Sequence, residues 1–200
     1  MINKEEIIKA SGLHPLRVLN IYLFGSRVYG NASDSSDWDV IIVAKTSSPE
    51  TEIKTDKFNI HILTIDRFQD GLDQHNIRNI ECLMGPDWTK LQEVYNFNFE
   101  LKLNRLRHSI SHINSNSWVK CKKKLNQGDY FIGIKSIWHS LRIVMFGIQI
   151  VKYGQIVDWS CANEIWKELI SKNWTWVELD ERFRTLNNHL LSEFRSVTFK

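Results

Sequence analysis

Residues 18–44 constrain the fold more than any other stretch, because they combine two apolar segments with a polar connection of fixed chemistry. The segments VLNIYLF and VIIVA are rich in β-branched and aromatic residues, which is typical of buried strands. The first ends at Gly25-Ser26, and SRVYG after it predicts one short helical turn. The chain should therefore build a sheet around these two strands.

Two carboxylates stand at the start of the second segment. Asp37 and Asp39 open DWDVIIVA, and side chains two residues apart on a strand point to the same face. Mg²⁺ is commonly held by one or two carboxylates, with water and phosphate oxygens filling its other positions. The pair predicts half of a magnesium site, although a lone Asp-x-Asp is more often only a solvated strand end.

The Gly25-Ser26 turn supplies the features of a phosphate site. Glycine lets the backbone approach a phosphate closely, Ser26 adds a hydroxyl, and free N–H groups at a helix start favour an anion. A Gly-Ser pair alone is most often a simple turn. Its position, with eleven residues between Gly25 and Asp37, makes the combined pattern far more specific than either part.

The stretch GSRVYGNASDSSDWDVIIV resembles the signature of the DNA polymerase β-like nucleotidyltransferase superfamily. The resemblance implies that Gly25 and Ser26 hold nucleotide phosphates, with Arg27 and Ser36 beside them. It also implies that Asp37 and Asp39 bind Mg²⁺ or Mn²⁺ for attack on the α-phosphate of an NTP, with loss of pyrophosphate.

That family normally supplies a third carboxylate from the next strand, and here the corresponding position is held by an amide. The strand should be KFNIHILT, residues 57–64, and the expected position falls on Asn59. His61 lies two residues on, hence on the same face, whereas Asp56 has the opposite parity. Histidine can act as a base near neutral pH but binds magnesium less well than a carboxylate. We take His61 as the candidate for the third role.

The predicted architecture is an α/β (α+β) nucleotidyltransferase domain with a short mixed sheet, residues 1–90, followed by an all-α domain, residues 91–200. Asn3 and Gly12 should cap a first helix, and Asp66 should cap the helix after the third strand. The expected helices cover residues 4–11, 66–74, 76–84, 99–126 (with an interruption near Ser115), 129–153, 160–171 and 175–194.

Three polar residues form one stripe on the apolar helix 129–153. Lys135, His139 and Arg142 follow i, i+4, i+7 spacing. The stripe either faces solvent or faces a cleft between the domains and contacts nucleotide phosphates. The segment resembles the helical part of small bacterial and phage predicted nucleotidyltransferases, which implies the nucleotide-binding role.

Charge and cysteine content indicate which partners and which cellular compartment suit the protein. Net charge is +3, yet residues 100–127 hold seven Lys or Arg and one acidic residue. The run KCKKK at 120–124 is either a solvated helix end or a contact for a nucleic-acid backbone. Three widely spaced cysteines and a first segment without a signal-peptide core predict a cytoplasmic protein. No membrane association is expected, because Lys135, His139 and Arg142 interrupt the longest apolar stretch.

The predicted reaction is transfer of a nucleoside monophosphate from an NTP to a hydroxyl. RNA or tRNA ends, a protein side chain and a small molecule such as an aminoglycoside all remain open as acceptors, since a fold does not settle its substrate. The alternative is a catalytically degenerate nucleotidyltransferase fold that binds nucleotide or RNA without turnover, which the missing third carboxylate favours.

Overall fold

A computed structural model describes residues 2–199 and divides the chain into two compact units, Met1–Leu101 and Lys102–Lys200. The first unit is a five-stranded mixed sheet with helices, and the second is entirely helical. This confirms the predicted fold class. Each unit is described by itself below.

The sheet has the order β3-β4-β2-β1-β5. Its strands are β1 Val18–Phe24, β2 Trp38–Ala44, β3 Glu50–Lys54, β4 Phe58–Leu63 and β5 Lys90–Glu93. The pair β2 and β4 is parallel, and every other neighbouring pair is antiparallel. β3 makes the return between the parallel strands, so no crossover helix is needed. The buried central strands match the predicted ones closely.

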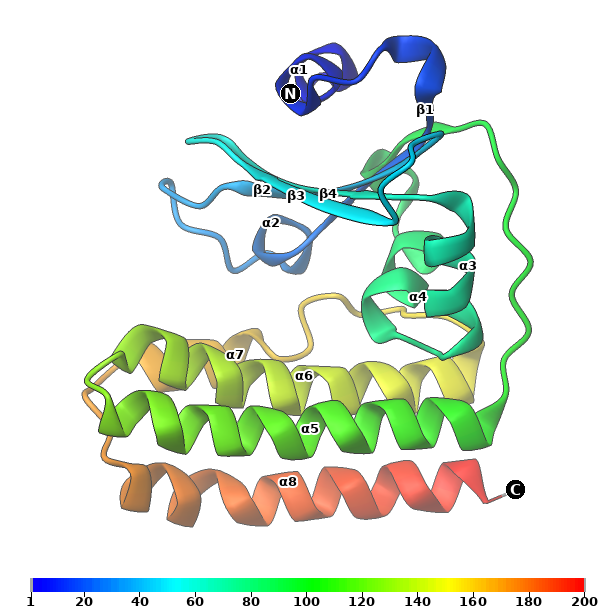
Figure 1. The fold of residues 1–200 in the computed structure, drawn as a ribbon. Helices are drawn as coiled ribbons and strands as arrows, with labels where there is room; N and C mark the ends of the chain where they lie inside the picture. The colour runs from blue at the N-terminus through cyan, green and yellow to red at the C-terminus, as the bar shows by residue number, and fades with distance from the viewer. Residues whose placement is uncertain (1, 200) are drawn as a thin grey trace. The chain divides into compact units, whose positions relative to one another are not determined.

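Helices cover both faces of the sheet. α1 Lys4–Ser11 lies on one face, whereas α2 Ser26–Tyr29, α3 Ile65–Asp73 and α4 Ile77–Met84 lie on the other (Figure 1). Asn3 and Gly12 cap α1 as predicted. The predicted cap at Asp66 is wrong, because Thr64 accepts the hydrogen bond from the Arg67 amide and Asp66 falls inside the first turn of α3. Two short 3₁₀ segments, Pro15–Arg17 and Asp87–Thr89, complete this unit.

The segment after β5 remains part of the first unit through alternate aromatic residues. The Phe97 ring lies 4.5 Å from that of Phe68 on α3, and the Phe99 ring lies 5.3 Å from that of His75. Asn20, fully buried on β1, accepts hydrogen bonds from the amides of Val94 and Tyr95. These contacts explain why the compact unit extends to Leu101.

The second unit consists of α5 Leu103–Asn126, α6 Tyr130–Tyr153, α7 Asn163–Ile170 and α8 Trp176–Thr198. The three long helices lie side by side, and α7 packs on α6 (Figure 1). The interruption predicted near Ser115 is wrong, because α5 is continuous. The buried amide of Asn114 is paired with the neighbouring helices: it donates to the Ser140 carbonyl on α6 and to Asn187 Oδ1 on α8, at 3.1 and 2.8 Å.

α6 is long and apolar enough to cross a membrane, but 72% of its most apolar window is buried inside the protein. It therefore serves as the core helix of the second unit, and Gly154 ends it in a left-handed conformation, as predicted.

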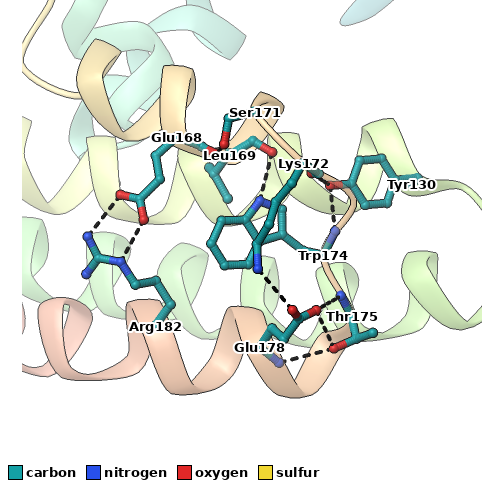
Figure 2. Close-up of polar contacts among 9 residues, drawn as sticks. All are labelled: Tyr130, Glu168, Leu169, Ser171, Lys172, Trp174, Thr175, Glu178 and Arg182. Atoms are coloured by element: carbon teal, nitrogen blue, oxygen red, sulfur yellow. Dashed lines mark hydrogen bonds and ion pairs between the residues drawn. The ribbon is translucent and has the colours of Figure 1, made fainter.

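A polar network fastens the connection between α7 and α8 (Figure 2). Arg182 donates to both carboxylate oxygens of Glu168, at 2.6 and 2.9 Å, and Trp174 Nε1 donates to the Leu169 carbonyl. Thr175 and Glu178 form a capping box at the start of α8, which satisfies two of the amides that a helix start leaves open. The network fixes where α8 begins.

Candidate active site

The Gly25 turn lies directly against the carboxylate of Asp39. Gly25 has φ 84° and ψ −165°, a conformation that is essentially restricted to glycine. A Cβ atom added there would lie 1.9 Å from Asp39 Oδ2, which no side chain could tolerate. The turn that we expect to hold phosphate and the carboxylate that we expect to hold metal are therefore in direct contact.

The two aspartates occupy different surroundings. Asp39 lies within β2, half-buried, with Phe24 of β1 and Asn59 of β4 as its register partners. Asp37 precedes the strand and is exposed. The prediction that both lie on the strand is wrong by one residue, because pairing with β4 begins where the Trp38 amide donates to the Lys57 carbonyl at 2.8 Å.

Arg27 closes the polar connection between α2 and β2. Its guanidinium donates through Nε, at 3.1 Å, and through Nη2 to the Ser36 carbonyl, and it lies 4.9 Å from the centre of the Trp38 ring. These contacts hold the loop that carries Asp37. The roles in nucleotide binding that we predicted for Arg27 and Ser36 stay predictions.

Asn59 lies beside Asp39, at the register position where the sequence places the missing carboxylate. Asn59 Nδ2 donates to Asp39 Oδ1 at 3.2 Å. Its own Oδ1 is buried and has no hydrogen-bond partner among residues 2–199. The amide therefore orients Asp39 and leaves one oxygen uncommitted.

The oxygen atoms at this place fit a hard divalent cation. Within residues 2–199, no cluster of three His, Cys, Asp or Glu side chains could hold a metal ion by itself. Mg²⁺ needs only one or two carboxylates together with water and substrate phosphate, and Asp39, with the uncommitted amide oxygen of Asn59 beside it, can supply one.

His61 lies one pleat further along β4, on the face that carries Asn59. Burial lowers the pKa of His61 below its usual 6.5, and the positive charge of Arg78 lowers it further. Its ring lies 6.1 Å from that of Phe24. The lowered pKa favours the neutral imidazole, and the catalytic role of His61 stays a prediction.

The sequence analysis missed a buried carboxylate that supports the turn. The Tyr29 hydroxyl, at the end of α2, donates to Glu81 Oε2 on α4 at 2.5 Å, and both residues are buried. A glutamate within the apolar helix IRNIECLM was the available signal, because a buried carboxylate needs a partner.

Lys135, His139 and Arg142 do not share one environment. Lys135 is exposed, His139 is half-buried, and Arg142 is only 3% exposed and lies 5.0 Å from the ring centres of both Trp138 and Phe146. A stripe facing solvent is therefore excluded at Arg142. Burial, followed by the charges of Arg142 and two lysines, lowers the pKa of His139 to about 3. Their predicted contact with nucleotide phosphates stays a prediction.

Comparison with known proteins places the chain in a family. The family model for polymerase β-type nucleotidyltransferases matches residues 5–133, more than half of the chain. No curated protein shows a significant match.

Two solved structures align over almost the whole chain. A nucleotidyltransferase-like protein from Exiguobacterium sibiricum 255-15 is 13% identical, with 98% of this chain and 73% of that chain covered and a TM-score of 0.35. The spectinomycin adenyltransferase AAD(9) from Enterococcus faecialis, crystallised with ATP and spectinomycin, is 12% identical, with 97% and 100% covered and a TM-score of 0.48. At these scores neither likeness bears on the substrate of this chain.

Proposed function

Since the chain belongs to the polymerase β-type nucleotidyltransferase family, we propose that it transfers a nucleoside monophosphate from an NTP to a hydroxyl acceptor. The observation that carries this proposal is the contact between the Gly25 turn and Asp39. It brings a backbone that can approach phosphate within reach of a carboxylate that can hold a divalent cation.

Each residue then has a defined task. Gly25 and Ser26 bind the β- and γ-phosphates, while Asp37 and Asp39 hold Mg²⁺ or Mn²⁺. When bound, the cation offsets the charge that develops on the α-phosphate. Asn59 orients Asp39 through its amide hydrogen bond. His61, whose lowered pKa favours the neutral imidazole, accepts the proton of the attacking hydroxyl.

The acceptor, the further phosphate contacts and the location in the cell are part of the same proposal. RNA, tRNA, a protein side chain and a small molecule each offer a hydroxyl that this chemistry can use. Lys135, His139 and Arg142 contact nucleotide phosphates. The cytoplasm is the expected location, which fits the free thiols of Cys82, Cys121 and Cys161.

The test is transfer of label from α-labelled NTPs in the presence of Mg²⁺ or Mn²⁺, with total RNA, cell extract and aminoglycosides as separate acceptors. The Asp37→Ala, Asp39→Ala double variant is the control for the site. Label that the wild type transfers and the double variant does not would support the proposal, and the labelled product would identify the acceptor class.

A second candidate is favoured by Asn59, which is an amide where the family has a carboxylate. A nucleotide-binding protein without turnover would bind NTP in a metal-dependent manner and transfer no label to any acceptor. Metal-dependent NTP binding that the double variant loses, with no transfer, would replace the first proposal by this one.

A further inference from the structure

A groove on the helical unit, formed by α5 and α8, has the chemistry of a ligand site that the proposed reaction does not use. It encloses about 850 Å³, within the range of sites that bind small molecules. Every residue that lines it belongs to residues 114–191, so the groove lies within one unit. It is distinct from the Gly25 and Asp39 site.

Two tryptophans supply its aromatic surface. The rings of Trp118 on α5 and Trp176 on α8 meet edge to face, with centroids 6.0 Å apart. Trp118 is 5% exposed, and its indole Nε1 is buried without a hydrogen-bond partner in the described part of the chain. Trp176 is only partly buried, which leaves ring surface available to a ligand. A buried indole N–H normally finds a partner, and this one has none among the described residues.

The rim of the groove is positively charged. Lys122, Lys123 and Arg184 line it, and none of its lining residues is acidic. Lys122 lies 5.7 Å from the centre of the Trp176 ring. Lys124, outside the groove, pairs with Asp129 at 3.0 Å, whereas Lys122 and Lys123 form no ion pair within residues 2–199. Two ammonium groups without a carboxylate partner therefore line the groove, and that of Lys122 lies over the partly buried indole of Trp176.

The groove also has a fixed polar floor. Asn114 and Asn187, both nearly fully buried, line it and hydrogen-bond to one another at 2.8 Å. A paired amide on each helix holds α5 and α8 in one alignment.

We propose that this groove binds an unpaired nucleotide, with the base stacked on Trp176 and the phosphate bound by Lys122 and Lys123. Aromatic rings beside lysines are the usual means of binding single-stranded nucleic acid, because every base has a face that stacks and every residue of the strand carries a phosphate. The nucleotide is either free or the single-stranded part of an RNA. The proposal is independent of whether the chain transfers nucleotides.

The experiment measures binding of a short fluorescein-labelled single-stranded RNA by anisotropy, with the full-length Asp37→Ala, Asp39→Ala variant in EDTA. These conditions remove metal-dependent binding at the proposed catalytic site, and the groove variants then show how much of the remaining binding belongs to the groove. Into this background we introduce Lys122→Gln with Lys123→Gln, and separately Trp176→Leu. The matched control is Lys4→Gln with Lys9→Gln, which removes the same charge from α1. Circular dichroism melting checks the fold of each variant.

The lysine pair should weaken binding about tenfold and lower the salt slope by about 1.4, which corresponds to two phosphate contacts on a single strand. Trp176→Leu should weaken binding at least about fivefold, and the control should leave it unchanged. Competition by AMP would identify a free nucleotide as the ligand, whereas binding of RNA without such competition would identify the strand.

Three results would overturn the proposal. They are absence of both RNA and AMP binding, binding that the lysine pair leaves unaltered, and equal affinity for a blunt RNA duplex, whose bases cannot stack on Trp176. Should Trp176→Leu fail to fold, the lysine pair still decides the outcome.

Discussion

At the scale of single residues, Gly25 is the position where the structure tolerates substitution least. Gly25→Ala places a methyl group 1.9 Å from Asp39 Oδ2 and forces alanine into a glycine conformation. We expect the free energy of unfolding to fall by about 3 kcal/mol or more, since strain and overpacking add. Nucleotide transfer should become undetectable. Denaturant titration and label transfer measure the two effects.

Gly12→Ala is the matched control for that substitution. Gly12 also has a positive φ, 67°, but a Cβ there meets no atom within 4 Å. Its cost should be only that of the left-handed backbone, about 1–2 kcal/mol, with transfer intact. Equal losses in the two variants would mean that contact with Asp39 is irrelevant to the site.

Asn59→Asp tests whether the amide at residue 59, in place of a carboxylate, determines how far the stability of the fold depends on a bound metal ion. The substitution replaces a donor to Asp39 Oδ1 by a second negative charge, and like charges at this distance repel. Without metal the melting temperature should fall, and Mg²⁺ should restore more of it than in the wild type. A melting temperature that responds to Mg²⁺ as in the wild type would show that no cation binds beside residue 59.

At the scale of elements, α2 depends on its anchor to α4. Tyr29→Phe removes the hydroxyl that donates to the buried Glu81, and leaving a buried acceptor with one donor fewer costs about 1–3 kcal/mol. Because α2 follows the Gly25 turn directly, the KM for NTP should rise several-fold while kcat changes less. Tyr153→Phe, at a tyrosine 61% exposed, should change neither. A fall in kcat at unchanged KM would argue against a positioning role.

The elements also show which parts of a fold the sequence can predict. β1, β2 and β4 were predicted because buried strands need apolar, β-branched residues. β3 and β5, with the sequences ETEIK and KLQE, were missed because edge strands are held by backbone hydrogen bonds that impose no side-chain pattern. α5 was predicted to break near Ser115 because of its run of polar residues, whereas the partners of the buried Asn114 lie on α6 and α8. Such pairing between distant residues leaves no local signal.

The candidate site likewise has features that the sequence predicts and features that it does not. The turn at Gly25 and the carboxylates at Asp37 and Asp39 lie close together in sequence, so their spacing indicates a shared site, and their roles stay predictions. The hydrogen bond from Asn59 to Asp39 depends on the register between two strands, and the bond from Tyr29 to Glu81 joins residues 52 positions apart. Contacts of this kind are fixed by tertiary packing alone.

At the scale of the whole molecule, stability should depend on pH through His139. The pKa of His139 is lowered from 6.5 to about 3 in the folded protein, so between these values the unfolded chain binds a proton that the folded chain does not. Stability is therefore highest above pH 6.5 and falls as the pH decreases, by at most about 1.4 kcal/mol per pH unit. His139→Gln should flatten the dependence in denaturant titrations at pH 7 and pH 5.

His189→Gln, which changes an exposed histidine on α8, is the control and should follow the wild-type profile. If the stability of His139→Gln fell with pH as steeply as that of the wild type, acid would destabilise the protein through other groups.

The position of β1 between β2 and β5 has a consequence for synthesis on the ribosome. β1 to β4 are consecutive in sequence and can pair as they emerge, whereas Tyr22 of β1 and its partner Lys90 on β5 lie 68 positions apart. Until residue 90 leaves the ribosomal tunnel, one edge of an apolar strand has no partner, and such edges recruit other chains. The nascent protein is thus most prone to aggregate after its candidate active site has assembled and before its first unit is closed.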